Sequence, residues 1–272
     1  MKAIAFLTLF CAVCLAQGLP KYRSDASNWE EVSLPKANTP EFQRLMKAAN
    51  GSPFEWAVSI ESGRVNAKLT ADVKPAEKPN FSLDCKDVPI QIRDAVRCSQ
   101  QVENGWLVAY NRGEFGGALW WFSINGATNR QLSPDQVNQF VKTKDGIFAM
   151  TGLAHGSTDE GSIIRLTNSR GKWQAATFAK LPQSGRAGTA LADGTLVVVT
   201  ADGLLCVAKD GQVAKLISGQ DWGLLYPNSI ATNDSKEFYI GMRQFVVVCS
   251  PSKPDGAIKW LIPGKQFLSK SD

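Results

Sequence analysis

The one histidine of this 272-residue chain lies in a segment that also carries two carboxylates. His155 is followed by Asp159 and Glu160, so the segment holds groups that serve as general bases and acids in enzymes. A histidine beside glycine and serine is more often a solvated loop residue, and glycosidases need two carboxylates set across a cleft. The segment therefore indicates a polar binding loop more strongly than a catalytic centre.

Other residues that can recognise a ligand are spread along the chain. Arg112 and Arg243 can each hold a carboxylate or a phosphate through two parallel hydrogen bonds. Trp222 and Tyr226 can stack on a sugar or another planar ligand, although such aromatic residues more often pack against protein. The expected ligand-binding residues are Arg112, Glu114, His155, Asp159, Asp221, Trp222, Tyr226, Asn228 and Arg243.

The sequence motifs of common catalytic sites are missing from the chain. It contains no Gly-x-Ser-x-Gly, P-loop, His-Glu-x-x-His or EF-hand motif. A single histidine also excludes a zinc site built from several histidines. We therefore predict no metal site and no cofactor, and the sequence identifies no catalytic residue.

A repeat occupies most of the sequence. Four segments share an apolar strand, a variable loop, a second strand, a tight turn with glycine and a third strand, and their turn glycines are Gly126, Gly171, Gly211 and Gly256. Segments 54–60 and 64–69 form a degenerate fifth copy. A period of roughly 40–50 residues is typical of β-propeller blades. We predict an all-β propeller of about five four-stranded blades, with six as the alternative count and a β-sandwich as the competing fold.

The turns of this repeat predict where binding residues gather. The turns between the first and second strands and between the third and fourth are tight Asn-Gly or Asp-Gly pairs, which suit two-residue hairpins. The remaining loops are longer and more varied, as binding loops usually are. They include residues 111–115, 154–160, 184–186, 220–228 and 242–244. We predict that they lie together on one face, around the mouth of the ring.

The N-terminal region differs from the repeat. Residues 1–18 resemble a signal peptide, with Lys2, an apolar run and small residues near the end. Residues 19–53 are expected to form an arm with one helix near 40–50, capped by Thr39 and starting at Pro40. Residues 29–34 are either a strand that completes a blade or an irregular segment. The propeller then spans 54–268, and 269–272 form a tail.

Export to an oxidising compartment affects the interpretation of the cysteines. Cys85 and Cys98 are close in sequence, and we predict a disulfide between them. Cys206 and Cys249 follow apolar runs, which favours buried free thiols over a second bridge.

Composition limits the class of protein and of partner. Hydrophobic residues make up 44% and charged residues 20% of the chain, which excludes a disordered protein. The net charge of +5 is spread along the chain, so no nucleic-acid partner is expected. Beyond the signal segment there is no apolar run long enough for a membrane span. We predict a secreted protein, periplasmic or extracellular, and a monomer.

Two blades resemble those of known propeller families. Residues 226–240 resemble the Pro-Asn-Gly-Ile-Ala blade of the gluconolactonase, strictosidine-synthase-like and NHL types, and residues 191–204 are similar to two-component-regulator blades. The gluconolactonase resemblance implies that Asn228 would help to ligate a divalent metal, with Glu55 as the corresponding glutamate. The aspartate that this family carries after the tyrosine-containing strand is replaced by residues 240–243, which include Arg243.

These observations favour a binding protein. We expect the loop-rich face to bind a small molecule, a glycan or a protein without catalysis. The alternative is a hydrolase or lactonase that uses carboxylates and Asn228 in the central channel, with Ca²⁺ as its metal. A third interpretation is a scaffold whose face docks another protein.

Overall fold

The computed structural model describes residues 20–234, 236–253 and 257–269. The predicted signal peptide and most of the predicted tail lie outside these residues. The described chain is built from antiparallel strands, one α-helix and short 3₁₀ turns. Within the described residues no helix is long and apolar enough to cross a membrane.

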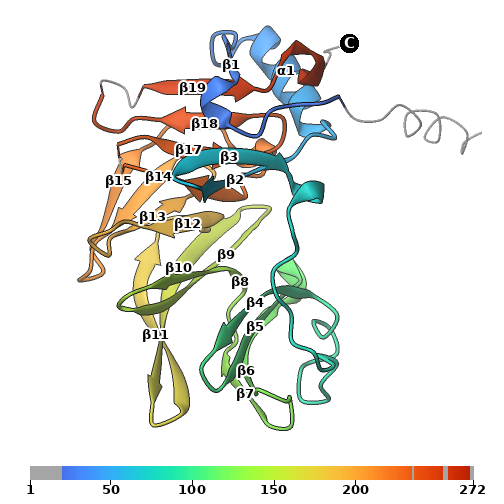
Figure 1. The fold of residues 1–272 in the computed structure, drawn as a ribbon, viewed down its shortest axis with the longest axis vertical. Coiled ribbons are helices and arrows are strands. Elements are labelled where there is room, and N and C mark those ends of the chain that lie inside the picture. Colours follow the sequence, from blue (N-terminus) through green and yellow to red (C-terminus); the bar gives the residue numbers. More distant parts are fainter. Residues whose placement is uncertain (1–19, 235, 254–256, 270–272) are drawn as a thin grey trace, which may run out of the picture.

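The strands pair with their neighbours in sequence and form successive sheets (Figure 1). We call them the first to fourth blades and the hairpin. The first blade is β4 (Val96–Val102), β5 (Gly105–Asn111), β6 (Gly117–Ser123) and β7 (Asn129–Ser133). The second is β8 (Val137–Thr143), β9 (Gly146–His155), β10 (Thr158–Ser169) and β11 (Lys172–Leu181). The third is β12 (Ala187–Ala190), β13 (Leu196–Val199), β14 (Leu204–Val207) and β15 (Val213–Ile217).

The last sheet and the hairpin complete the set of strands. The fourth blade is β16 (Ser229–Ala231), β17 (Phe238–Gly241), β18 (Val246–Cys249) and β19 (Ile258–Ile262), extended by β1 (Glu30–Val32) on the outer edge of β19. The hairpin is β2 (Trp56–Glu61) and β3 (Arg64–Leu69). The sheets thus follow the repeat predicted from the sequence, and the degenerate copy has two strands.

The first strands of successive blades lie next to one another: β4 by β8, β8 by β12, β12 by β16, and β16 by β2. Each blade therefore extends outward from a row of inner strands. This is the arrangement of a β-propeller, so the predicted all-β propeller is confirmed. The predicted count of about five four-stranded blades is not confirmed, because the described residues form four blades and a two-stranded hairpin.

The tight turns have the backbone geometry that the sequence predicted. Gly126 and Gly211 adopt φ values of 73° and 86°. An L side chain is disfavoured there, and a Cβ on Gly211 would come within 2.6 Å of the Phe178 carbonyl oxygen. Glycine at these positions lets two outer strands of a blade reverse within a few residues.

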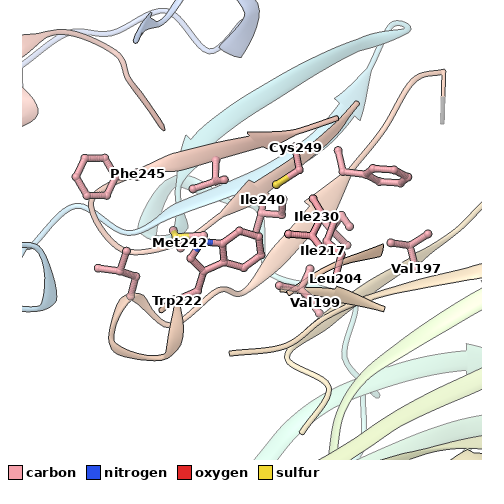
Figure 2. Packing of buried hydrophobic residues seen from close by; sticks show 14 of the residues in the cluster. Val197, Val199, Leu204, Ile217, Trp222, Ile230, Ile240, Met242, Phe245 and Cys249 are labelled. Atoms are coloured by element: carbon pink, nitrogen blue, oxygen red, sulfur yellow. The ribbon is translucent and has the colours of Figure 1, made fainter. Parts of the chain in front are cut away.

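Apolar residues pack between neighbouring blades. One cluster joins the first and second blades, another the second and third, and another the third and fourth. The largest lies between the third and fourth blades, where Val197 and Leu204 face Ile240 and Cys249 (Figure 2). Such burial is the main term that holds blades together, at roughly 25 cal/mol per Å² of apolar surface.

The strands of the hairpin pack against the fourth blade, and a connecting segment leads from the hairpin to the first blade. Its Trp56 and Val58 pack with Val246 and Leu261 of the fourth blade. The far face of the first blade is instead covered by residues 81–96, which include Val88 and other apolar side chains. The segment from residue 70 to 95 therefore leads from the hairpin to the first blade and packs on the face of that blade that points away from the second blade.

The N-terminal arm contains the predicted helix. Helix α1 runs from Pro40 to Asn50, the Thr39 side chain accepts a hydrogen bond from the Phe42 amide at 3.2 Å, and Gly51 ends it. Residues 30–32 form strand β1, which pairs with β19, so the strand alternative for this segment is the observed one. Short 3₁₀ turns lie at Ala26–Asn28, Thr70–Asp72, Gly113–Phe115, Gly223–Leu225 and Lys265–Phe267.

The predicted Cys85–Cys98 disulfide is wrong, because both thiols are free. The first blade lies between them: Cys98 packs with the cluster toward the second blade, and Cys85 with the cluster under residues 81–96. The Cys85 sulfur accepts a hydrogen bond from Asn129 Nδ2 at 3.3 Å. Closeness in sequence misled the prediction, since the chain turns around a sheet edge between them. Cys206 and Cys249 are also free, as expected, but only Cys249 is buried and Cys206 is half-buried.

Candidate functional site

The longer loops leave their blades at one end. Because the strands of each blade alternate in direction, the connections β5–β6, β9–β10, β13–β14 and β17–β18 share an end with the connections between blades. We call this end the loop face and the opposite one the turn face. All of the expected ligand-binding residues lie on or beside loop-face connections: Arg112, Glu114, His155, Asp159, Asp221, Trp222, Tyr226, Asn228 and Arg243.

The charged residues at the first and second blades are paired with one another. The His155 Nε2 atom lies 2.5 Å from Oε2 of Glu114, and Arg112 forms an ion pair with Asp94. These side chains are largely exposed, so each pair contributes little to stability. The Glu114–His155 contact holds the β5–β6 turn against the end of β9.

Asp159 has a structural partner. Its Oδ1 accepts a hydrogen bond of 2.8 Å from the backbone amide of Ser184, a residue that is buried in the connection between the second and third blades. The carboxylate therefore fixes the segment that leads to Arg186. The neighbouring Gly152 and Gly161 let this segment approach closely, since a Cβ on Gly152 would collide with Ser184 and a Cβ on Gly161 with the Gln183 carbonyl oxygen.

A second polar group gathers where the hairpin meets the fourth blade. Asn228 Nδ2 donates to Oε1 of Glu55 at 3.1 Å, and the Ser229 hydroxyl donates to Oδ1 of Asn228 at 2.8 Å. The backbone amide of Asn228 donates a hydrogen bond to the backbone carbonyl of Gly241. The two residues that the gluconolactonase resemblance pairs, Glu55 and Asn228, are thus in direct contact.

Arg243 is held by several partners at this place. Its Nη1 donates to the Asn50 carbonyl at 2.7 Å, and its Nη2 lies 3.8 Å from Oε2 of Glu55. The carbonyl belongs to the last residue of α1, where the helix carries partial negative charge. The guanidinium carbon lies 4.5 Å from the ring centre of Tyr226, a favourable cation–π distance. Arg243 therefore acts as a support for the Tyr226 ring.

Tyr226 is presented to solvent in an unusual conformation. Its φ and ψ are 51° and 62°, the left-handed region that bulky residues seldom adopt. The side chain is 45% exposed. Backbone strain of this kind concentrates at functional sites, and here it places an aromatic ring on the loop face.

The residues around Glu55 do not fit a divalent metal. A calcium site needs several oxygen ligands and a surplus of negative charge. Glu55 is instead balanced by the Arg243 guanidinium, and the Asn228 side chain turns an amide donor toward it. Among the described residues no cluster of three His, Cys, Asp or Glu side chains is placed to hold a metal. The Arg243 guanidinium supplies beside Glu55 the positive charge that a metal ion would otherwise supply.

Trp222 differs from the other expected residues. Trp222 is 0% exposed and belongs to the core between the third and fourth blades, beside Met242 (Figure 2). Its indole ring packs against residues of α1 and of the fourth blade. Asp221, directly before it, is exposed.

Arg186 belongs to the segment 184–186, which the sequence predicts on this face, but the sequence assigns no role to it. It lies at the entrance to β12, where its amide donates to the Val199 carbonyl at 2.8 Å. Its Nε is buried without a hydrogen-bond partner, and within the described part of the chain its side chain forms no ion pair. The sequence offered no signal for this, because only the surroundings distinguish a paired arginine from an unpaired one.

Apolar side chains and a cavity complete the loop face. Phe115 is 66% and Leu224 47% exposed, on the first blade and before the fourth blade respectively. A surface cavity of about 310 Å³ opens beside the connection from the first to the second blade. Its polar lining includes Asp135, Gln136, Thr151, Glu160, Ser162 and Lys180.

The comparison with known sequences gives no family. No protein-family model and no curated protein matches the chain. Solved structures resemble it at low identity. A gluconolactonase of Xanthomonas campestris is 13% identical with a TM-score of 0.36, over 60% of this chain and 55% of that protein. The chain thus matches little more than half the length of that enzyme.

Two further structures cover more of the chain. The extracellular domain of a one-component system of B. thetaiotaomicron is 12% identical with a TM-score of 0.45, over 88% of this chain and 29% of that protein. A catalytically inactive virginiamycin B lyase of Staphylococcus aureus, crystallised with quinupristin, is 10% identical with a TM-score of 0.40, over 88% and 90%. These β-propeller proteins differ in activity, so the fold assignment rests on the sheets themselves and the likeness transfers no function.

Proposed function

We propose that this protein binds an acidic ligand on its loop face without catalysing a reaction. The observation that carries the proposal is Arg186, whose guanidinium has a buried nitrogen and no partner in the described chain. A buried polar group without a hydrogen bond costs on the order of 1–3 kcal/mol. A carboxylate that pairs with the Arg186 guanidinium would form a charge-assisted hydrogen bond and would supply the partner that the described chain does not.

The exposed apolar residues of the loop face indicate what else the ligand carries. In the order of the blades, Arg186 comes between Phe115 and the exposed pair Leu224 and Tyr226. Exposed apolar side chains on the same face as an unpaired arginine are typical of sites for ligands with both kinds of group. The proposed ligand therefore combines a carboxylate with apolar or aromatic groups, as a small molecule, a glycan derivative or a protein segment would.

A binding measurement with matched variants tests this proposal. N-acetyl-Phe-Glu is the probe and N-acetyl-Phe-Gln its neutral counterpart, with binding followed by NMR titration of the backbone amides. Arg186→Gln should weaken binding of the acidic peptide roughly tenfold. Arg170→Gln removes the same charge from the turn face and should leave binding unchanged. Equal loss in both variants, or equal affinity for both peptides, would contradict the proposal.

The contact between Glu55 and Asn228 favours a second candidate, a hydrolase or lactonase. Under this alternative Glu55 would act as the acid or base at the inner mouth of the ring. A thermal-shift measurement with Ca²⁺ separates the candidates. We expect no rise in melting temperature, since Arg243 already balances Glu55. A rise that disappears in Asn228→Ala would favour the enzyme.

We further propose export and a monomeric state. Support comes from the sequence of residues 1–18, which resembles a signal peptide. Expression of the full chain should yield a mature protein that begins after Ala16 or Gly18, as N-terminal sequencing would show. Size-exclusion chromatography with light scattering tests the monomer.

A further inference from the structure

A pocket on the turn face lies between the second and third blades. Its volume is about 270 Å³, close to the lower end of the range for small-molecule sites, roughly 300 Å³. Three tight turns and the three strands β9, β10 and β11 form it. The residues that line it are Lys144, Asp145, Phe148, Arg165, Phe178, Gly194 and Lys209.

The lining is strongly basic. Lys144, Arg165 and Lys209 come from different turns or strands, and Asp145 is the one carboxylate among the lining residues. None of the three cations forms an ion pair within the described part of the chain. Arg165 Nη2 donates to the Asp145 backbone carbonyl at 3.1 Å, which fixes the guanidinium while leaving other donors free.

One more carboxylate stands near the pocket, outside its lining. Asp193 accepts hydrogen bonds from the amide and hydroxyl of Thr195 at 2.9 and 3.1 Å. These bonds lower its pKa, with a smaller contribution from the charge of Lys209. Although Asp193 acts on Lys209 through its charge, the two side chains form no ion pair within the described residues, so the Lys209 ammonium has no carboxylate bound to it.

The apolar wall of the pocket is aromatic. The ring centres of Phe148 and Phe178 lie 5.1 Å apart, and Arg165 stands 6.0 Å from the Phe148 ring centre. Phe178 is the extra residue of a β-bulge, because Ile163 pairs with Ala179 whereas Ile164 pairs with Thr177. Bulges redirect side chains and are frequent beside functional sites. The partly exposed Phe178 ring lines the pocket here.

We propose that this pocket binds a small organic anion in which a phosphate or sulfate ester is attached to a flat apolar group. The ester lies between Lys144, Arg165 and Lys209, and the flat group packs against Phe178. The site is separate from the loop face, since its three turns connect the opposite ends of the strands.

Calorimetric titration of the full chain at low salt tests the proposal. The probes are 4-nitrophenyl phosphate, 4-nitrophenyl sulfate, inorganic phosphate and benzyl alcohol. We expect the two aryl esters to bind most tightly and the neutral alcohol not to bind. The two esters also distinguish a phosphate site from a sulfate site, and tighter binding of either supports the proposal.

Single-charge variants locate the site. Arg165→Gln and Lys209→Gln should each weaken aryl ester binding roughly fivefold. Lys172→Gln, an exposed lysine at the start of β11 on the same face but outside the pocket, is the matched control and should bind as the wild type does. Equal weakening in Lys172→Gln would show general attraction by net charge and overturn the proposal, as would absence of binding.

A third variant tests the aromatic wall. Phe178→Leu keeps the bulged position apolar but removes the ring. Affinity for the aryl esters should fall roughly threefold, while affinity for inorganic phosphate stays the same. An unchanged aryl affinity in a protein with wild-type melting temperature would contradict the proposed packing.

Discussion

The Arg243 side chain both stabilises the fold and positions residues of the candidate site on the loop face. Its guanidinium binds the end of α1 through the Asn50 carbonyl, faces Glu55 and supports the ring of Tyr226. These partners lie far from it in sequence, so the arginine ties the arm and the hairpin to the fourth blade. Tyr226 can then hold its left-handed backbone conformation at the surface.

Replacing Arg243 should therefore cost more than replacing an exposed arginine. Arg243→Gln removes a charge-assisted hydrogen bond, an ion pair and the ring contact, and it leaves Glu55 without its counter-charge. We expect the free energy of unfolding to fall by about 2 kcal/mol, as urea unfolding followed by fluorescence would measure. Arg112→Gln is the control, because its pair with Asp94 is exposed, and it should change stability by less than about 0.5 kcal/mol. Equal effects would contradict the role of Arg243.

The free thiols give a second residue-scale prediction. Cys85 and Cys98 lie on opposite sides of the first blade, so neither can reach the other without unfolding. Alkylation of the purified protein in denaturant, with no reductant, should modify both cysteines. Peptide mass spectrometry would identify the labelled sites, and a peptide pair linked through these residues would contradict the structure.

At the scale of single elements, the residue types in short segments were enough to predict the hairpin turns and the start of α1. Asp-Gly and Asn-Gly pairs mark hairpin turns because glycine tolerates positive φ. The regular spacing of these pairs predicted where the successive blades lie in the sequence. Thr39 and Pro40 marked the start of α1 for a similar local reason. The candidate site could not be predicted in this way, since its contacts join residues distant in sequence. Glu55 meets Asn228 across 173 positions and Asn50 meets Arg243 across 193.

The helix cap is an element whose contribution can be measured. The Thr39 hydroxyl oxygen accepts from the Phe42 amide and donates to the Lys36 carbonyl. Thr39→Ala should lower the free energy of unfolding by about 1 kcal/mol, whereas Thr39→Ser keeps the oxygen and should stay close to the wild type. Thermal unfolding followed by circular dichroism measures both. A loss of equal size in the two variants would point to the methyl group instead of the cap.

At the scale of the whole molecule, packing between successive blades holds the sheets together. Clusters join the first blade to the second, the second to the third, and the third to the fourth. The hairpin then packs on the fourth blade, and residues 81–96 cover the remaining face of the first. Two of the interfaces between blades contain a thiol: Cys98 between the first and second blades, and Cys249 between the third and fourth. Loss of a proton at either place would put a charge between packed sheets.

These thiols predict that the molecule loses stability in alkali. Cys98 is partly exposed as a residue, but its sulfur packs toward the second blade, 3.9 Å from the Asn138 carbonyl oxygen, and desolvation raises its pKa from 9.0 to about 12. Burial raises the pKa of Cys249 as well. An acid whose pKa is raised by folding contributes stability below its unfolded pKa, and that stability is lost as the pH rises from 9.0 toward 12.

The expected loss can be isolated with one substitution. At about 1.5 pH units above the unfolded pKa, Cys98 alone should lower the free energy of unfolding by on the order of 2 kcal/mol. Cys98→Ala has no such group, so its stability should decline less steeply between about pH 8.5 and about pH 10.5, even if its packing is poorer at every pH. Urea unfolding at several pH values measures both slopes. Parallel pH profiles for the two proteins would show that Cys98 takes up water and charge without opening the interface between the first two blades.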